Sequence, residues 1–308
     1  MPGMRNVTLR QLQIFVAAAD SLSFSRASTQ LHLTQPAVSM QMRQLEHSAG
    51  LPLFERLGKR LHLTEAGNEL LGYARQALRA LKEADDAFAA LRGLRGGMLR
   101  IGVVSTAKYF APKLLAQFAR SHAEVEIKLA VNNREAVVRQ LDLNEIDIAV
   151  MGQPPRHLET LAVPFARHPL SIIAAPDHPL ASRKRIPLRA LESETFMVRE
   201  PGSGTRSAME HYFHDQGVRV RVGMEMSSNE TIKQAVMAGM GVAFISEHTI
   251  GLELAAAQLC VLKVEGLPVL RRWYVVHLEA KRLSPAAVAF KKFMLDEGSA
   301  LLRKWPQG

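Results

Sequence analysis

The 308-residue sequence contains a single cysteine, Cys260, which leaves no partner for a disulfide within the chain. This scarcity is typical of proteins in a reducing compartment, and we expect the protein in the cytoplasm. No apolar run approaches the roughly 18 to 20 residues that a membrane-spanning helix needs, and the N-terminus lacks the apolar core of a secretory signal. The sequence therefore predicts no association with a membrane.

Local signatures of catalytic and metal sites are also missing. There is no G-x-S-x-G nucleophile motif, no H-E-x-x-H zinc motif, no cysteine pair, no P-loop and no dinucleotide-binding glycine fingerprint. The 11 histidines do not have the spacing of metal ligands. We therefore expect no enzyme activity, no metal and no cofactor. An α/β small-molecule-binding protein, or an enzyme without visible catalytic residues, is the alternative from another class.

Composition indicates a globular protein of two or three modules. Hydrophobic residues make up 47% of the chain and charged residues 22%. The formal net charge is +10, and residues 1–98 contribute +4 of it. Because both parts of the chain are basic, we expect polyanionic partners for the N-terminal part and a smaller anion for the rest.

Residues 23–46 have the pattern of a helix-turn-helix. Ser23 can cap a first short helix, a turn follows at residues 32–33, and Thr34 or Gln35 can cap a second helix. In this second helix the apolar residues fall on one face and the polar residues on another. Such a helix lies in the DNA major groove, although an ordinary helical domain is the alternative. The candidate DNA contacts of this segment are Ser23, Ser25, Arg26, Thr34, Gln35, Pro36, Ser39, Met40 and Arg43.

The segments on either side support this interpretation. Thr8 and Gln11 can form a capping box for a preceding helix that reaches about Asp20. Residues 54–63 alternate enough to predict a two-stranded wing with a basic tip. Contact with DNA phosphates or the minor groove would suit this tip, and a solvated turn is the alternative. The candidate wing contacts are Arg56, Lys59 and Arg60.

A long helix is predicted after the wing, over residues 64–92. Its apolar residues recur in alternating steps of four and three, which is a heptad seam: Leu70, Ala74, Ala77, Leu81, Ala84, Phe88 and Leu91. A long helix with one apolar seam is stable only if the seam is covered, either by its own protein or by a second copy. We favour a second copy, and hence a homodimer. Glycines at positions 93, 96 and 97 predict a hinge.

From residue 98 onward, short runs rich in Val and Ile alternate with helical patterns, which indicates a parallel sheet and two α/β subdomains with a cleft between them. The expected strands are 98–105, 125–131, 146–151, 170–174, 195–199, 222–226, 242–246 and 273–278. The expected domains are a DNA-binding domain (1–63), a linker helix (64–92), a hinge (93–97) and a C-terminal region of two α/β subdomains (98–308).

Small, hydroxyl-bearing and basic residues follow several of these strands. Ligands of open α/β sheets bind beyond the carboxyl ends of strands, where helix N-termini favour anions. A phosphate or carboxylate would suit such residues, although each could equally be a helix cap or part of a flexible loop. The candidate ligand contacts are Ser105, Thr106, Ala107, Lys108, Asn133, Arg134, Met151, Gly202, Ser203, Gly204, Thr205, Arg206 and Asn229.

Two sets of stretches carry a resemblance to a known family. The first set resembles the N-terminal domain of LysR-type transcriptional regulators and covers about the first 70 residues. Its stretches are TLRQLQIFVAAAD, LSFSRAS, LHLTQPAVSMQMRQLE and GLPLFERLGKRLHLTEAG. The second set resembles the CbbR branch of this family, the regulators of Calvin-cycle carbon-fixation operons. Its stretches are STAKYFAPKLLAQF, REPGSGTRSAMEHYF, SNETIKQAVMAGMGVAFIS and RRWYVVHLEAKRLSPAAVAF.

This resemblance implies a winged helix-turn-helix and a periplasmic-binding-protein-like effector domain, in which the chain crosses to the second subdomain and returns. The implied bounds are 98–168 with 271–308 for effector subdomain I and 169–270 for effector subdomain II. The implied partners are double-stranded DNA with an interrupted palindrome, further copies of the chain up to a homotetramer, and RNA polymerase. DNA binding would place the protein on the nucleoid. The implied effector is an anionic metabolite such as ribulose bisphosphate, 2-phosphoglycolate, phosphoenolpyruvate or NADPH, and the implied targets are RuBisCO genes. A LysR-type regulator of nitrogen, sulfur or aromatic metabolism is the alternative.

Overall fold

The computed structural model describes residues 4–58, 60–91 and 97–303 and divides the chain into two compact units, Met1–Phe88 and Ala89–Gly308. Lys59 of the predicted wing tip and residues 92–96 of the predicted linker and hinge lie outside the described residues. Across the described ranges, no helix is long and apolar enough to cross a membrane. The same ranges contain no group of His, Cys, Asp or Glu residues that could hold a metal ion.

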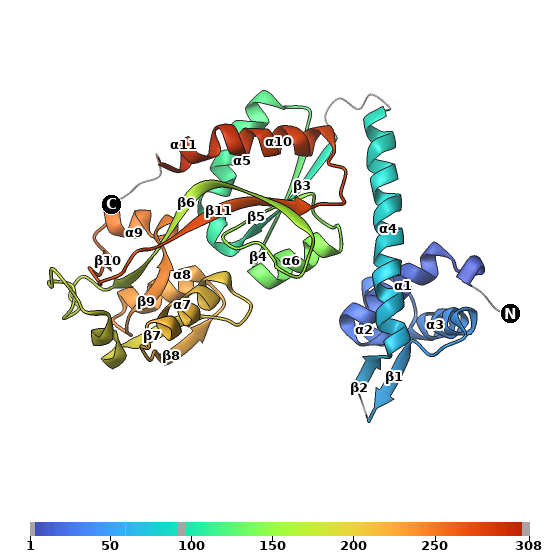
Figure 1. The fold of residues 1–308 in the computed structure, drawn as a ribbon, viewed down its shortest axis with the longest axis horizontal. Coiled ribbons are helices and arrows are strands. Elements are labelled where there is room, and N and C mark those ends of the chain that lie inside the picture. The colour runs from blue at the N-terminus through green and yellow to red at the C-terminus, as the bar shows by residue number, and fades with distance from the viewer. Residues whose placement is uncertain (1–3, 59, 92–96, 304–308) are drawn as a thin grey trace. The chain divides into compact units, whose positions relative to one another are not determined.

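The N-terminal unit is a winged helix-turn-helix followed by a long helix (Figure 1). Thr8 and Gln11 form the predicted capping box, and the side chains of Ser23 and Thr34 cap the next two helices as expected. The elements are η1 Met4–Asn6, α1 Leu9–Ser21, α2 Phe24–Gln30, α3 Gln35–Ala49, β1 Phe54–Leu57, β2 Arg60–Leu63 and α4 Glu65–Leu91.

Apolar side chains from α1, α3 and the wing fill the core of this unit. The rings of Phe15 and Phe54 meet edge to face with centroids 5.5 Å apart, and Leu45 on the inner side of α3 is fully buried. The Glu46 carboxylate accepts hydrogen bonds from the backbone N–H groups of Leu53 (2.9 Å) and Phe54 (3.2 Å). These contacts fix the wing against α3 and leave the polar face of that helix outside the core.

The C-terminal unit consists of two lobes, each with its own hydrophobic core. The first lobe contains three parallel strands in the order β4-β3-β5, and its core includes Phe118, Trp273 and Phe290. Its elements are β3 Met98–Val104, η2 Ser105–Tyr109, α5 Ala111–Ser121, β4 Glu126–Asn132, α6 Arg134–Asp142, β5 Ile148–Met151, α10 Pro285–Asp296 and α11 Gly298–Arg303.

The second lobe repeats this α/β pattern around a core that includes Phe196 and Phe213. Its strands β7 and β8 pair in parallel. Its elements are η3 Leu188–Ser193, β7 Thr195–Arg199, α7 Gly204–Asp215, β8 Arg221–Met226, α8 Asn229–Met237, β9 Ala243–Ser246, η4 Glu247–Thr249, α9 Gly251–Ala255 and β10 Cys260–Val261.

Two long strands, β6 Thr160–Ala174 and β11 Val269–Leu278, run through both lobes and pair antiparallel (Figure 1). Phe165 packs in the core of the first lobe, whereas Leu170 packs in the core of the second. The strands predicted at 170–174 and 273–278 are therefore parts of two longer strands, whereas the parallel sheet predicted from the first three strands is confirmed. Prolines and charged residues interrupt the apolar pattern where these strands cross between the lobes, so the pattern shows only their fully buried ends.

Candidate functional site

Helix α3 is the second helix of the helix-turn-helix, the one predicted to lie in the DNA major groove, and is called the recognition helix below. It presents a polar face beside its buried one. Val38 is fully buried, whereas Gln35, Met40 and Arg43 are exposed and Ser39 is half-buried. The amide nitrogen of Gln35 donates a hydrogen bond to Ser39 Oγ (3.2 Å), and Arg43 Nε donates to the Ser39 carbonyl (3.4 Å). These bonds align the side chains in one row on the helix, which is the arrangement that reads base edges in a major groove.

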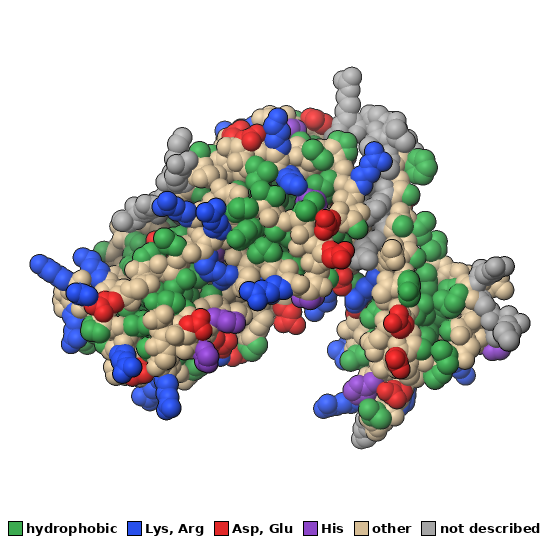
Figure 2. All heavy atoms as spheres, in the orientation of Figure 1, with side chains coloured by type: hydrophobic (Ala, Val, Ile, Leu, Met, Phe, Trp, Pro, Cys, Tyr) green, Lys and Arg blue, Asp and Glu red, His purple; other side chains and the backbone are tan. Residues whose placement is uncertain are grey.

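The remaining DNA candidates surround this row. Ser25 and Arg26 on α2 are exposed, as are Pro36 and the wing residues Arg56 and Arg60. The hydroxyl oxygens of Ser23 and Thr34 accept capping hydrogen bonds from Arg26 N–H (3.3 Å) and Ala37 N–H (3.4 Å), so these two residues have a structural role. No ion pair between described residues involves Arg26, Arg43, Arg56 or Arg60, and their charges are therefore open to phosphates. Figure 2 shows Lys and Arg side chains near the wing.

A cavity lies between the two lobes of the C-terminal unit, with an empty volume of about 340 Å³ including its mouth. It opens where β3 and β5 end, where α6 and α7 begin and where β6 and β11 cross. The lining residues are Val104, Ser105, Thr106, Arg134, Gly152, Gln153, His168, Ser203, Gly204, Thr205 and Arg271.

Two arginines in this cavity have only neutral hydrogen-bond acceptors among the described residues. Arg134 donates to the carbonyls of Gln153 (3.0 Å) and Pro154 (3.2 Å). Arg271 donates to the carbonyls of Gly204 (3.3 Å) and Gly152 (3.1 Å) and to Gln153 Oε1 (2.9 Å). Burial lowers the pKa of both guanidinium groups, and the charge of Arg134 lowers the pKa of Arg271 further. Two half-buried positive charges without a carboxylate partner favour an anionic ligand.

The start of α7 adds to this positive field. Ser203 caps the helix, and its first backbone N–H groups carry the positive end of the helix dipole. Gly204 permits a close approach, because a Cβ atom at this position would lie 3.3 Å from Arg134 Cδ. The α6 arginine of the first lobe therefore packs directly against the helix start of the second lobe.

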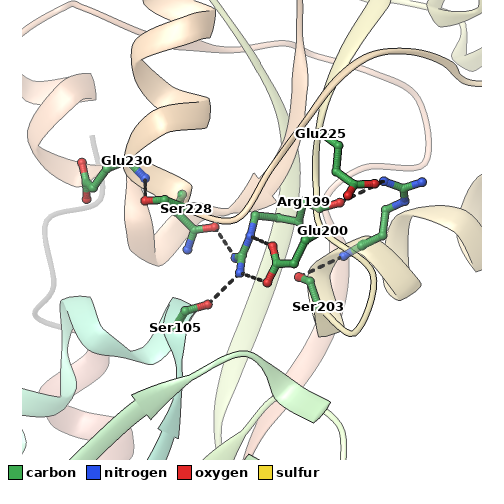
Figure 3. Close-up of polar contacts among 9 residues, drawn as sticks. Ser105, Arg199, Glu200, Ser203, Glu225, Ser228 and Glu230 are labelled. Carbon is green, nitrogen blue, oxygen red and sulfur yellow. Dashed lines mark hydrogen bonds and ion pairs between the residues drawn. The ribbon is translucent and has the colours of Figure 1, made fainter. Parts of the chain in front are cut away.

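Arg199 is more deeply buried than either cavity arginine and has a different role; Figure 3 shows its polar contacts. It is 3% exposed and forms two hydrogen bonds with the Glu200 carboxylate, at 2.7 and 2.9 Å. It also donates to Asn229 Oδ1 (2.6 Å) and, across the lobes, to Ser105 Oγ (3.0 Å). Its charge is thus balanced within the protein. Arg199 therefore links the two lobes.

Tyr109 forms a second link between the lobes. Its hydroxyl donates to Glu230 Oε1 (2.5 Å), and Lys233 Nζ lies 4.8 Å from the centre of its ring. Burial and the hydrogen bond to Glu230 raise the pKa of Tyr109. Burial alone would raise the pKa of Glu230, but hydrogen bonds from Tyr109 and Lys233 outweigh it and lower that pKa. At neutral pH the phenol therefore stays protonated and the carboxylate charged, which strengthens this contact.

Six of the thirteen predicted ligand residues line the cavity: Ser105, Thr106, Arg134, Ser203, Gly204 and Thr205. Ala107 and Met151 are buried in the core of the first lobe, and Asn133 caps α6. Gly202 precedes the α7 cap with φ +83°, and Lys108 lies over the Tyr109 ring.

Two further candidates, Arg206 and Asn229, belong to internal networks. Arg206 donates to the Arg199 carbonyl (2.9 Å) and pairs with Glu210 and Glu225, while Asn229 accepts from Arg199. Sequence reasoning missed five lining residues, Val104, Gly152, Gln153, His168 and Arg271. His168 and Arg271 lie on the crossing strands, and only a prediction of their pairing could have found them.

Comparisons with known proteins match both parts of the chain. Residues 9–68 match the model of the bacterial regulatory helix-turn-helix protein, lysR family, and residues 92–299 match the LysR substrate binding domain. A RuBisCO operon transcriptional regulator of Allochromatium vinosum is 50% identical over 296 residues, which cover 96% of this chain and 98% of that protein. The transcriptional regulator CbbR of Rhodospirillum rubrum is 51% identical over 93% of this chain and 95% of its own length.

Solved structures agree with this similarity. The regulatory domain of CcmR from Synechocystis, in complex with 2-PG, is 40% identical, with a TM-score of 0.64, and the match covers 68% of this chain and 99% of that domain. Full-length CbnR with its target DNA is 24% identical with a TM-score of 0.60 over 93% of this chain and 98% of that one, which is a likeness of fold.

Proposed function

Because the chain belongs to the LysR family of bacterial helix-turn-helix transcriptional regulators, we propose that it controls carbon-fixation genes in response to a small phosphorylated metabolite. As a family member it is a DNA-binding regulator and not an enzyme. Relatives of about 50% identity over almost the whole chain are named as regulators of the RuBisCO operon, which supports this group of target genes over nitrogen, sulfur or aromatic metabolism.

The pair Arg134 and Arg271 carries the proposal for the ligand. Both guanidinium groups face a confined cavity without a carboxylate among its lining residues, beside the start of α7. The cavity is small, since its volume of about 340 Å³ includes the open mouth, and this favours 2-phosphoglycolate or phosphoenolpyruvate over the much larger NADPH. The related domain at 40% identity is a complex with 2-PG, which supports the same ligand here.

The proposed mechanism is ligand-stabilised closure of the two lobes. Arg134 belongs to the first lobe and the start of α7 to the second, so an anion that contacts both favours the closed arrangement. The Arg199–Ser105 and Tyr109–Glu230 hydrogen bonds already join the lobes. A ligand can shift such an equilibrium only by its differential affinity for the two states. We propose that this shift alters DNA binding by α3 and the wing in the cytoplasm.

Leu70 and Ala74 at the start of the α4 seam pack into the N-terminal core, but the exposed remainder of the seam supports homodimer formation, with a homotetramer through the effector domains. Leu81 and Phe88 of the predicted heptad are 43% and 58% exposed, and Figure 2 shows hydrophobic side chains along this helix. Two copies joined along α4 would present two recognition helices to an inverted repeat. Leu81→Arg should abolish dimers in analytical ultracentrifugation, whereas Gln76→Arg, an exposed change off the seam, should not. Equal dimerisation of both variants would place the interface elsewhere.

A thermal-shift titration of the full chain tests the ligand. A ligand that binds only the folded state should add about 2.7 kcal/mol of stability at 100 times its Kd. We expect a saturable shift with 2-phosphoglycolate or phosphoenolpyruvate, a smaller one with ribulose bisphosphate or NADPH, and a changed footprint on the promoter of a carbon-fixation operon. Normal promoter binding without any ligand shift would refute the proposed effector class and retain the regulator.

A further inference from the structure

One side of the cavity that contains Arg134 and Arg271 is formed by a histidine whose ring nitrogens form no hydrogen bond with any described residue. His168 pairs with Arg271 in the antiparallel register of β6 and β11, so both side chains leave the same face of these strands. His168 is 4% exposed and lines the cavity. Neither ring nitrogen has a hydrogen-bond partner among the described residues. Buried polar groups without a hydrogen-bond partner are uncommon in folded proteins, and a bound ligand is one explanation for such a group.

The orientation of this ring is fixed on two sides. One face of His168 stacks on Trp273, with centroids 3.9 Å apart and planes within 18°. The Nδ1 edge lies so close to Gly152 that a Cβ there would be 2.7 Å from it. Gly152 also accepts the hydrogen bond from Arg271 through its carbonyl. The glycine thus positions the histidine and the arginine together, and the ring has little freedom to turn away from the cavity.

The ring is also kept neutral. Burial, the nearby His248 and the charge of Arg271 lower the pKa of His168 well below its ordinary value. A neutral imidazole has one N–H donor and one bare nitrogen acceptor. It therefore adds a directional hydrogen bond to a cavity whose positive charge already comes from Arg134 and Arg271.

From this geometry we propose that His168 donates a hydrogen bond to an oxygen of the bound ligand other than those held by the two arginines, and thereby selects ligands with a second acceptor group besides the phosphate. The proposal rests on the proposed function of the cavity and deepens it. The matching ligand class is a small phosphorylated carboxylic acid, whose phosphate and carboxylate are separate acceptors. Inorganic phosphate would satisfy the arginines alone.

Calorimetric titration of the full-length protein with 2-phosphoglycolate and with inorganic phosphate tests this idea. His168→Phe keeps a ring for stacking on Trp273 but removes both nitrogens, and it should weaken 2-phosphoglycolate binding about 10-fold or more while changing phosphate affinity less than about threefold. His168→Gln retains an N–H donor and should recover most of the selectivity. His248→Phe is the matched control, because His248 belongs to the same aromatic cluster but does not line the cavity.

The outcomes separate the two proposals. If His168→Phe and His168→Gln both bind 2-phosphoglycolate like the wild type, His168 does not contact the ligand, while the arginine site stands. An equal loss of affinity for both ligands in a folded His168→Phe variant would mean a structural role and would also overturn the inference. If the wild type binds neither ligand, the proposed function of the cavity fails, and the role of His168 fails with it.

Discussion

The helix-turn-helix with its wing and the cavity between the lobes both present positive charge, but in different environments. The cations of α2, α3 and the wing are exposed, so water solvates them before DNA arrives. Arg134 and Arg271 are held in a cavity by neutral carbonyls and the Gln153 side chain, and they have lost much of their hydration. An exposed charge can be replaced with little effect on the fold, whereas a buried one must be balanced by the protein or by a ligand.

The largest effect should come from the buried arginine that the protein balances itself. Arg199→Ala leaves Glu200 and Asn229 without their partner and should lower the free energy of unfolding of the C-terminal unit by about 3 kcal/mol. Urea unfolding followed by tryptophan fluorescence reports this unit, because both tryptophans lie beyond residue 97. Arg185→Ala, which removes the exposed pair with Glu265, should lower it by less than about 1 kcal/mol. Equal effects would erase the distinction between buried and exposed pairs.

Removing a cavity arginine should affect the ligand more than the fold. Arg271→Ala should weaken 2-phosphoglycolate binding about 100-fold, or roughly 2.7 kcal/mol, because a charged hydrogen-bond donor is lost from a confined site. Arg272→Ala is the matched control, since the neighbouring residue is exposed and does not line the cavity. Isothermal titration measures both. A similar loss in the two variants would indicate general electrostatic attraction and no defined site.

Substitutions on the exposed face of α3 should weaken DNA binding without lowering the stability of the protein. Gln35→Ala and Arg43→Ala should each weaken specific DNA binding by about 1 to 3 kcal/mol, because each removes a base-reading side chain. Their melting temperatures should stay close to that of the wild type. His47→Ala, exposed near the end of the same helix, should change affinity by less than about 0.5 kcal/mol. Gel-shift titrations at fixed salt decide this, and unchanged sequence preference would remove both residues from the interface.

The smallest effect should be a pH dependence of the buried histidines. Burial lowers the pKa of His248 from 6.5 to about 4, so the folded protein binds fewer protons than the unfolded chain between these values. This contribution to stability is complete above pH 6.5 and is lost as pH falls toward 4. His248 should account for about 1 kcal/mol between pH 6.5 and 5.5. His248→Phe should flatten the curve of unfolding free energy against pH by this amount, measured by urea unfolding at several pH values, and an unchanged curve would contradict this assignment.

The sequence-based predictions were more accurate for the N-terminal unit than for the cavity between the lobes. The helix caps at Ser23 and Thr34, the two-stranded wing and the long helix after it are all confirmed. Arg206 and Asn229 do not line the cavity, because glutamate and arginine partners take up their hydrogen bonds. Their role as ligand contacts stays a prediction. The domain boundaries and the DNA-contact residues stay predictions.

The sequence by itself determined the family, the helix-turn-helix and the α/β character of the remainder, because these depend on interactions between residues a few positions apart. Only the tertiary structure decided the cavity. It needed the antiparallel register that places His168 beside Arg271, and the packing of Arg134 against the start of α7. The charge of Arg199 is balanced within the protein, whereas those of Arg134 and Arg271 have no carboxylate partner. This difference depends on contacts between segments far apart in the chain, which no local pattern encodes.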